Sequence, residues 1–224
     1  MIASSTRQQI GIITDRPMFR SEITDFVESQ GSVEITRVLT HAQLLTNSFG
    51  QLPPITICDL YTSKDSALPA IFHLMDNRAS TEVVYVLRDE GDTRTSNILR
   101  ILCRLRAKAC LSSDTAPPQI LDAVERVVLG QTIICNRLQE NFPWQQTVGR
   151  DEPKVGGPLQ PLTLRQIQIL SLLATGLTVQ QVAGQLHLSP RTVESHKYHM
   201  MKTLNCNCLV SLCRFAIRHG LIVA

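Results

Sequence analysis

The 224-residue chain has no run of eighteen or more apolar residues, so no segment has the length of a membrane-spanning helix. Its first ten residues lack the apolar stretch of a secretory signal peptide. Seven cysteines, an odd number without a tight repeating spacing, fit reduced thiols better than a disulfide framework. These absences lead us to expect a cytoplasmic protein.

Aromatic residues are also scarce, at 4% of the chain, whereas hydrophobic residues reach 43%. This composition excludes a disordered chain and favours cores built from aliphatic side chains. The length of 224 residues is compatible with two small domains.

Motifs of catalysis and of metal binding are missing as well. The sequence has no Ser, His and Asp in the order of a hydrolase, no phosphate-binding glycine loop and no metalloprotease helix motif. His196, His199, Cys206 and Cys208 are competent zinc ligands, but their spacing does not bring all four to one face of a continuing helix. We therefore expect no enzyme activity, no bound cofactor and no metal site among these four residues.

Acidic residues are nearly absent from the C-terminal part of the chain. Residues 161–224 contain six basic residues and a single acid, Glu194, which gives a charge of +5. The remaining residues hold sixteen bases and eighteen acids, which gives −2. A basic end on a slightly acidic body suits a polyanionic partner for that end alone. Charge by itself leaves a solvated basic face without a partner as the alternative.

The first 135 residues alternate short apolar runs with segments of helical spacing, which is typical of a parallel sheet covered by helices. The five expected strands are residues 10–14, 33–38, 55–59, 83–87 and 109–112. The expected helices between them are residues 19–30, 67–77, 94–105 and 118–129. The functional site of such a flavodoxin-like α/β fold lies at the carboxyl ends of the strands. The residues expected to converge there are Thr14, Asp15, Asp59 and those that follow Leu87 and Leu111.

Between residues 136 and 160 this pattern fails, because prolines and glycines interrupt any long element. We interpret this segment as a linker. The predicted organisation is an α/β domain over residues 1–135, a linker over 136–160 and an all-α domain over 161–224.

Short helical patterns follow each other closely in the all-α domain. The hydroxyl residues placed to cap the first three helices are Thr163, Thr178 and Ser189. Two helices joined by a tight turn, with the small Ala183 at their crossing, are typical of a helix-turn-helix. The second helix of such a pair, here residues 191–204, enters the major groove of DNA.

Helical spacing divides this second helix into two faces. The face expected to pack inward holds Val193, His196, Met200 and Leu204. The face expected to point outward and read DNA holds Glu194, Ser195, Lys197, Tyr198, Met201 and Lys202.

Seven short motifs run through residues 161–222. They are Leu162-Thr163-x-Arg165, Gly176-Leu177-Thr178, Val182-Ala183, Leu186-x-Leu188-Ser189, Thr192-Val193-x-x-His196, Lys202-x-Leu204 and Gly220-Leu221-Ile222. Together they resemble the LuxR/NarL-type DNA-binding domain. Gln166 departs from the family, which usually has an acid there, and Glu194 departs where many members have a base. Because a carboxylate accepts a hydrogen bond from cytosine N4, Glu194 is expected to change which base is read.

The resemblance implies which residues contact double-stranded DNA. Base-edge contacts are implied for Glu194, Ser195 and Tyr198, with Lys197 at the margin. Phosphate contacts, which position the protein without reading sequence, are implied for Thr178, Arg191, Thr192 and Lys202.

The α/β part resembles the receiver domain of a response regulator. The motifs that carry this likeness are Thr14-Asp15-Arg16-Pro17-Met18-Phe19-Arg20 after the first strand and Cys58-Asp59-Leu60 at the end of the third. The resemblance aligns Asp59 with the phosphoacceptor. Phosphoryl transfer to an aspartate needs Mg²⁺ held by neighbouring carboxylates, together with a lysine and a hydroxyl that bind the phosphoryl oxygens.

This chain supplies only part of that set. The departures are Thr14 for the first acid, Leu87 for the hydroxyl residue, Ser113 for the lysine and Cys110 for the aromatic residue that switches with the hydroxyl. Asp15 and Asp59 still suggest a weak Mg²⁺ site. We therefore expect a degenerate receiver, or pseudo-receiver, in which Asp59 is a hydrogen-bonded carboxylate at a strand end.

The last helical pattern, residues 208–219, is expected to face the core or a dimer seam. Its inward stripe holds Leu209, Leu212, Cys213, Ala216 and Ile217. The resemblance implies that DNA-binding domains pair through this helix, with Val210 and Arg214 facing the second subunit.

Our hypothesis is a homodimeric transcription regulator whose control does not depend on ordinary aspartate phosphorylation. Control would then come from a partner protein, from a small ligand in the altered pocket, or simply from the expression level. One alternative is an interaction protein that heterodimerises with another regulator and modulates it. The other is a conventional regulator phosphorylated at Asp59 by a histidine kinase.

Overall fold

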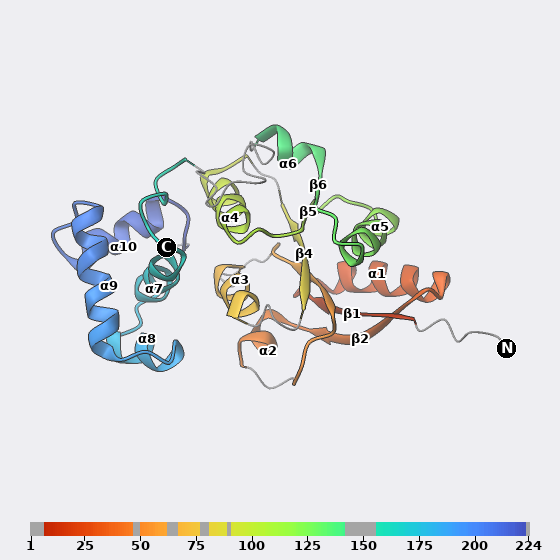
Figure 1. Ribbon diagram of the computed structural model, residues 1–224, viewed down its shortest axis with the longest axis horizontal. Coiled ribbons are helices and arrows are strands. Elements are labelled where there is room, and N and C mark those ends of the chain that lie inside the picture. The colour runs from red at the N-terminus through yellow and green to blue at the C-terminus, as the bar shows by residue number, and fades with distance from the viewer. Residues whose placement is uncertain are drawn as a thin grey trace. The chain divides into compact units, whose positions relative to one another are not determined.

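The computed structural model describes residues 7–46, 50–61, 67–76, 81–88, 91–141 and 156–222 (Figure 1). The chain forms two compact units. The first unit comprises Met1–Glu90 and Arg106–Phe142, and the second comprises Gly91–Leu105 and Pro143–Ala224.

A parallel sheet lies at the centre of the first unit. Within the described residues it has six strands in the order β2-β1-β3-β4-β5-β6. The strands are β1 (Gln8–Ile13), β2 (Val33–Leu39), β3 (Ile55–Asp59), β4 (Glu82–Leu87), β5 (Ala109–Ser112) and β6 (Ile133–Ile134). Strand β1 pairs in parallel with β2 on one side and with β3 on the other. The carboxyl ends of β1 and β3 are therefore adjacent.

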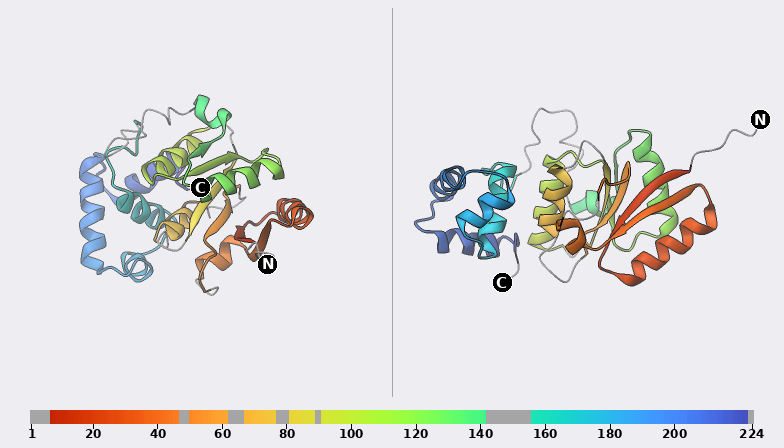
Figure 2. Two further views of the ribbon diagram at one scale, coloured as in Figure 1. Left: turned by 45° about the vertical axis from the view of Figure 1, so that its right-hand side comes forward. Right: turned by 90° about the horizontal axis from the view of Figure 1, so that it is seen from below.

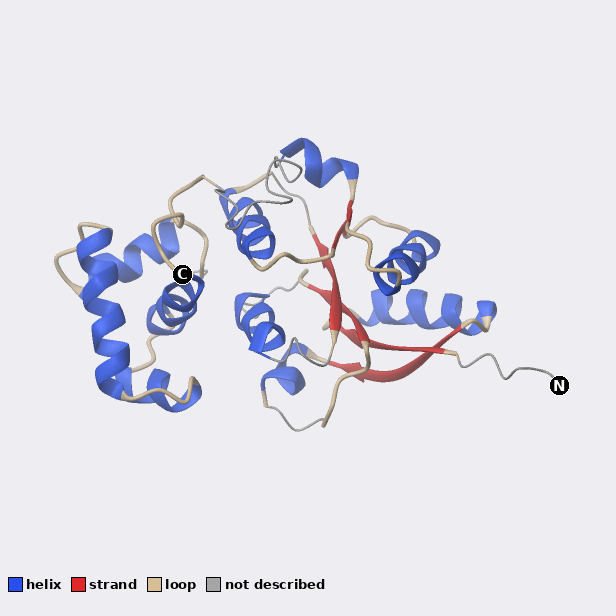
Figure 3. Cartoon of the chain, viewed as in Figure 1, coloured by secondary structure: helices blue, strands red, loops and turns tan. Residues whose placement is uncertain are grey.

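Helices cover both faces of this sheet (Figure 3). The helices of the first unit are α1 (Pro17–Gln30), α2 (His41–Leu45), α3 (Ala67–Asp76), α5 (Pro117–Val128) and α6 (Asn136–Asn141). Figure 2 shows α1 and α5 on the face of the sheet opposite α3. Pro17 supplies the fixed φ that suits the first position of α1, and Gly31 ends that helix in the left-handed conformation at φ 68°.

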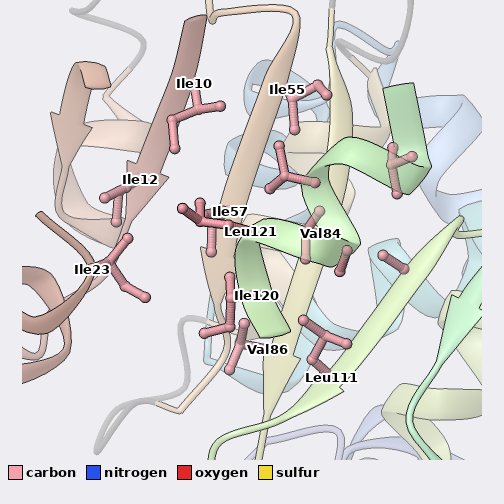
Figure 4. Packing of buried hydrophobic residues seen from close by; sticks show 14 of the residues in the cluster. Ile10, Ile12, Ile23, Ile55, Ile57, Val84, Val86, Leu111, Ile120 and Leu121 are labelled. Carbon is pink, nitrogen blue, oxygen red and sulfur yellow. The ribbon is translucent and has the colours of Figure 1, made fainter. Parts of the chain in front are cut away.

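The core between the sheet and the α1–α5 layer consists mainly of aliphatic side chains (Figure 4), together with the ring of Phe19. Ile57 and Val84 from the two central strands are fully buried, as are Ile120 and Val124 from α5. Strands buried on both faces explain the near-continuous apolar runs that predicted them.

The five predicted strands and three of the four helices predicted for the α/β part are present in this unit, with ends within two residues of the prediction. The helix predicted over residues 94–105 is α4 (Thr93–Arg104), which belongs to the second unit. Three short elements were not predicted. They are α2, the two-residue strand β6 and α6, which begins at Asn136 inside the segment expected to be a linker. The sheet is therefore larger by one strand than the five-stranded sheet that we expected.

The second unit is helical in its described residues. Its helices are α4 (Thr93–Arg104), α7 (Leu164–Ala174), α8 (Val179–Gln185), α9 (Pro190–Thr203) and α10 (Leu209–Arg218). The predicted caps are confirmed, since the side chains of Thr163, Thr178 and Ser189 accept hydrogen bonds from backbone N–H groups in the first turns of α7, α8 and α9. Throughout the described part of the chain, no helix is both long and apolar enough to cross a membrane.

The central core predicts a position-dependent loss of stability. Ile57→Ala should lower the free energy of unfolding by about 2 to 5 kcal/mol, because it leaves a cavity in a fully buried strand. Val38→Ala on strand β2, where the side chain is 37% exposed, is the matched control and should cost about 1 kcal/mol or less. Urea unfolding followed by circular dichroism measures both. Equal losses would contradict the placement of β3 in the core.

Candidate functional site

The carboxyl ends of β1 and β3 bring Thr14 and Asp59 together, as predicted. The carboxylate of Asp59 is fully buried and accepts three hydrogen bonds. Thr14 Oγ1 and Arg16 Nε each donate to Asp59 Oδ2 at 2.7 Å, and the backbone N–H of Tyr61 donates to Oδ1 at 3.0 Å. Both oxygens of Asp59 are thus bonded within the protein, and its charge is neutralised by a guanidinium group.

Aromatic rings fix the position of that guanidinium. Arg16 Cζ lies 4.6 Å from the centroid of Phe19 and 4.8 Å from that of Tyr61, which are cation–π distances. A second guanidinium, from Arg88, lies 5.2 Å from the Tyr61 ring and donates to its hydroxyl oxygen at 2.9 Å. The side chain of Arg16 is 27% exposed, so this ion pair is mostly shielded from solvent.

Asp15 turns to a different partner. Its Oδ1 accepts the backbone N–H of His41 at 3.0 Å, and its Oδ2 lies 3.0 Å from Nδ1 of the same residue. His41 is the first residue of α2 and is buried. The two carboxylates that suggested a shared metal site therefore have separate contacts inside the protein.

These contacts do not fit Mg²⁺. The ion requires several oxygen ligands in near-octahedral geometry, and the cation Arg16 already bonds Asp59 Oδ2. Within the residues that the structure describes, no three His, Cys, Asp or Glu side chains are grouped to hold a metal ion. The weak magnesium site suggested by the sequence is not supported by this geometry.

The other departures from the receiver pattern supply no charge to this site. They are Leu87, Cys110 and Ser113. Leu87 and Cys110 are buried in the sheet. Ser113 lines a cavity of about 370 Å³ together with Asp15 and Arg16. Burial raises the pKa of the Cys58 thiol, and the nearby Asp59 and Asp15 raise it further, so this thiol stays protonated.

The sequence interpretation missed the roles of Arg16 and His41. Arg16 stands in the quoted motif, two residues after the expected end of the first strand at residue 14. That position already indicated a place near Asp59. A long side chain can reach many partners, however, and only the rings of Phe19 and Tyr61 show which one it takes.

A second candidate site is the pair of helices α8 and α9. Val182 and Ala183 of α8 pack with Val193 and Met200 of α9, and all four side chains are buried. Arg165 closes the turn between the helices from α7, because its Nη2 donates to the carbonyl oxygen of Leu186 at 2.9 Å. This arrangement is a helix-turn-helix.

The outward face of α9 is polar, as predicted. Glu194, Ser195, Tyr198 and Lys202 are exposed, and Lys197 is half-buried. Lys197 Nζ and Glu194 Oε2 form an ion pair at 2.6 Å. Burial lowers the pKa of the half-buried His196, with smaller effects of Arg165 and His199, so His196 adds no positive charge near neutral pH.

The residues implied as phosphate contacts lie at or near helix ends. Thr178 precedes α8, and Arg191 and Thr192 stand in the first turn of α9. The first-turn N–H groups and the helix dipole of such ends favour anions. Lys202 is exposed in the last turn of α9.

The apolar stripe of the last helix, expected to serve the core, a dimer seam, or both, is divided between buried and exposed residues. Leu212 and Ala216 are fully buried, but Leu209 is 39% and Ile217 is 38% exposed. Val210 is 66% exposed, and Arg214 is exposed as well. The helix α10 therefore buries a narrower stripe than its sequence suggested and leaves apolar surface uncovered within the unit.

Parts of the chain are similar in sequence to known bacterial regulators. Residues 160–216 match the family described as bacterial regulatory proteins, luxR family. The response regulator UvrY of Escherichia coli (strain K12) is 35% identical over 116 residues, which are 51% of each chain. The chain therefore spans about half the length of the curated relatives that it matches at this identity. The nitrate/nitrite response regulator protein homolog of Haemophilus influenzae is 25% identical over 89% of this chain and 91% of its own.

Solved structures show the same fold. The response regulator RcsB of Salmonella typhimurium superposes with a TM-score of 0.55 at 19% identity, over 93% of this chain and 96% of RcsB. RcsB in a complex with DNA superposes with a TM-score of 0.51 at 17% identity, over 93% and 97% of the two chains. The chain thus combines a parallel α/β unit with a helix-turn-helix whose residues 160–216 match the luxR family, and its fold is similar to that of the response regulator RcsB.

Proposed function

We propose that this chain is a sequence-specific, DNA-binding transcription regulator whose control does not depend on ordinary aspartate phosphorylation. Residues 1–135 form the pseudo-receiver, residues 136–160 the linker and residues 161–224 the DNA-binding domain. The observation that carries the second half of the proposal is the ion pair between Asp59 and Arg16.

DNA binding is supported by the helix-turn-helix and by charge. The basic residues of 161–224 exceed the single acid by five, and the exposed face of α9 is polar. We assign base-edge contacts to Glu194, Ser195, Lys197 and Tyr198. We assign phosphate contacts to Thr178, Arg191, Thr192 and Lys202. RcsB, which has a similar fold, has been solved in a complex with DNA, and this supports DNA binding by the chain.

Phosphorylation independence follows from the bonds that Asp59 already makes. A nucleophilic oxygen must be free to attack phosphorus, and a metal must draw charge from the phosphoryl group. Here three donors hold the carboxylate, and Arg16 takes the position of a bound cation. The pseudo-receiver then serves as a docking and dimerisation platform.

A homodimer is supported by the surface of α10. Leu209, Val210 and Ile217 are apolar and exposed, and Arg214 lies among them in sequence. RcsB has been solved as dimers bound to DNA. We propose that two copies of this chain pair through α10 when they bind DNA.

Phosphorylation of Asp59 can be tested by measuring the intact mass of the protein. Incubation with acetyl phosphate and Mg²⁺ should leave the intact mass unchanged, because Arg16 bonds the Asp59 carboxylate oxygen that would otherwise face the metal ion. A response regulator that becomes modified in the same reaction is the positive control. Asp59→Asn should bind duplex DNA with an affinity close to that of the unaltered protein. Stoichiometric phosphorylation coupled to tighter DNA binding would restore an ordinary two-component switch.

The ion pair also predicts a coupling of stability. Arg16→Met should lower the free energy of unfolding by about 3 kcal/mol, because the buried carboxylate of Asp59 loses its cation. Asp59→Asn removes that buried charge, so Arg16→Met should cost much less in an Asp59→Asn background. Urea unfolding of the four proteins gives the coupling energy. Simple additivity of the two changes would show that the pair does not neutralise Asp59.

Phosphate and base contacts predict different losses of DNA affinity. Lys202→Ala should weaken binding to every duplex and flatten its salt dependence, because one phosphate contact and its counterion release are lost. Tyr198→Ala should cost about 1 to 3 kcal/mol at the preferred site and relax discrimination at particular base pairs. Fluorescence anisotropy titrations on preferred and random duplexes at several salt concentrations measure both. The same loss of affinity on both duplexes for both variants would show that the outward face of α9 does not read the base sequence.

A further inference from the structure

The exposed face of α9 presents an acceptor and a donor as one fixed pair. Glu194 and Lys197, three residues apart on the helix, are joined at 2.6 Å, and their side chains are 51% and 23% exposed. A carboxylate can accept up to about four hydrogen bonds and an ammonium donates three. The ion pair therefore leaves both groups with further bonds to make.

The major-groove edge of a base pair carries the complementary pair of groups. Each Watson–Crick pair places an amino group beside a keto oxygen, and the two are hydrogen-bonded at roughly 3 Å. This spacing is close to the 2.6 Å between Glu194 Oε2 and Lys197 Nζ. The carboxylate can face the amino group while the ammonium faces the keto oxygen, so four alternating partial charges form a square.

Neighbouring atoms on the groove edge rank the four base pairs. When cytosine faces Glu194, Lys197 meets both O6 and N7 of guanine, which are acceptors. When adenine faces Glu194, the carboxylate gains N6 but lies near the acceptor N7, and Lys197 meets only O4 of thymine. Thymine opposite Glu194 places O4 against the carboxylate, and guanine places both O6 and N7 there.

We propose that the Glu194–Lys197 pair reads one C·G base pair as a unit, with cytosine facing Glu194. The preference at that position follows the order C·G, then A·T, then T·A, with G·C last. This inference rests on the proposed function, and it adds the base that is read and the residues that read it. Each residue contributes through the other, because the ion pair fixes the orientation of both.

The test begins with the full-length protein and a duplex library of random sequence. Sites enriched by repeated binding supply a preferred duplex, and competition anisotropy then compares all four base pairs at each position. One position should show the order above, with C·G preferred over G·C by at least about tenfold. Enriched sites without such a position would overturn the inference and leave DNA binding intact. No salt-dependent binding to any duplex would overturn the proposed function itself.

A charge-swapped variant separates this inference from a merely structural role of the ion pair. Glu194→Lys combined with Lys197→Glu keeps the net charge and the pair but reverses its direction. The preference at that position should invert towards G·C. Glu194→Gln is the second variant, and its neutral amide, which both donates and accepts, should shrink the preference without inverting it. A preference that keeps its order in the charge-swapped variant and its full size in Glu194→Gln would overturn the inference.

Discussion

The first unit depends on the neutralisation of one buried charge. Asp59 has no solvent exposure at the end of a central strand, and an unpaired carboxylate in such a position would be strongly destabilising. Arg16 supplies the opposite charge, and the hydroxyl of Thr14 bonds the same carboxylate oxygen. A second acid in place of Thr14 would repel Asp59 unless a cation were bound between them. Thr14 and Arg16 therefore act together. Arg16 supplies the cation from within the chain, and Thr14 bonds Asp59 without adding a second negative charge.

Much of the fold was predictable because its elements are long enough to show a period. The buried strands read as apolar runs, and the amphipathic helices α1, α4 and α5 repeat their apolar residues at helical spacing. Short elements have no period to detect. The five-residue helix α2 is instead defined by the capping box of Thr40 and Gln43, and the two-residue strand β6 by its pairing with β5. Both depend on contacts between residues rather than on a repeat.

The candidate sites were predictable to the extent that backbone direction decides them. Thr14 and Asp59 meet because parallel strands end at one edge of the sheet, and Glu194 and Tyr198 face outward because the helical period places them there. Partner choice by long side chains was not predictable in the same way. Arg16 is directed by two rings, and Asp15 by the first residue of α2. The excess exposure of Leu209 and Ile217 likewise depends on how narrowly α10 packs on its neighbours.

The ion pairs Asp59–Arg16 and Glu194–Lys197 illustrate how burial decides what a charge can do. At Asp59 three hydrogen bonds from within the fold hold the two carboxylate oxygens, so a ligand that takes the place of Arg16 must first break a bond that neutralises a buried charge. At Glu194 both partners reach solvent, so their mutual bond costs little and leaves donors and acceptors free. An exposed pair of this kind adds little to stability, yet it limits the orientations that two flexible side chains can adopt. Preorganisation of that sort lowers the entropy lost when a matching base pair is bound, so it raises the affinity for that base pair relative to the others.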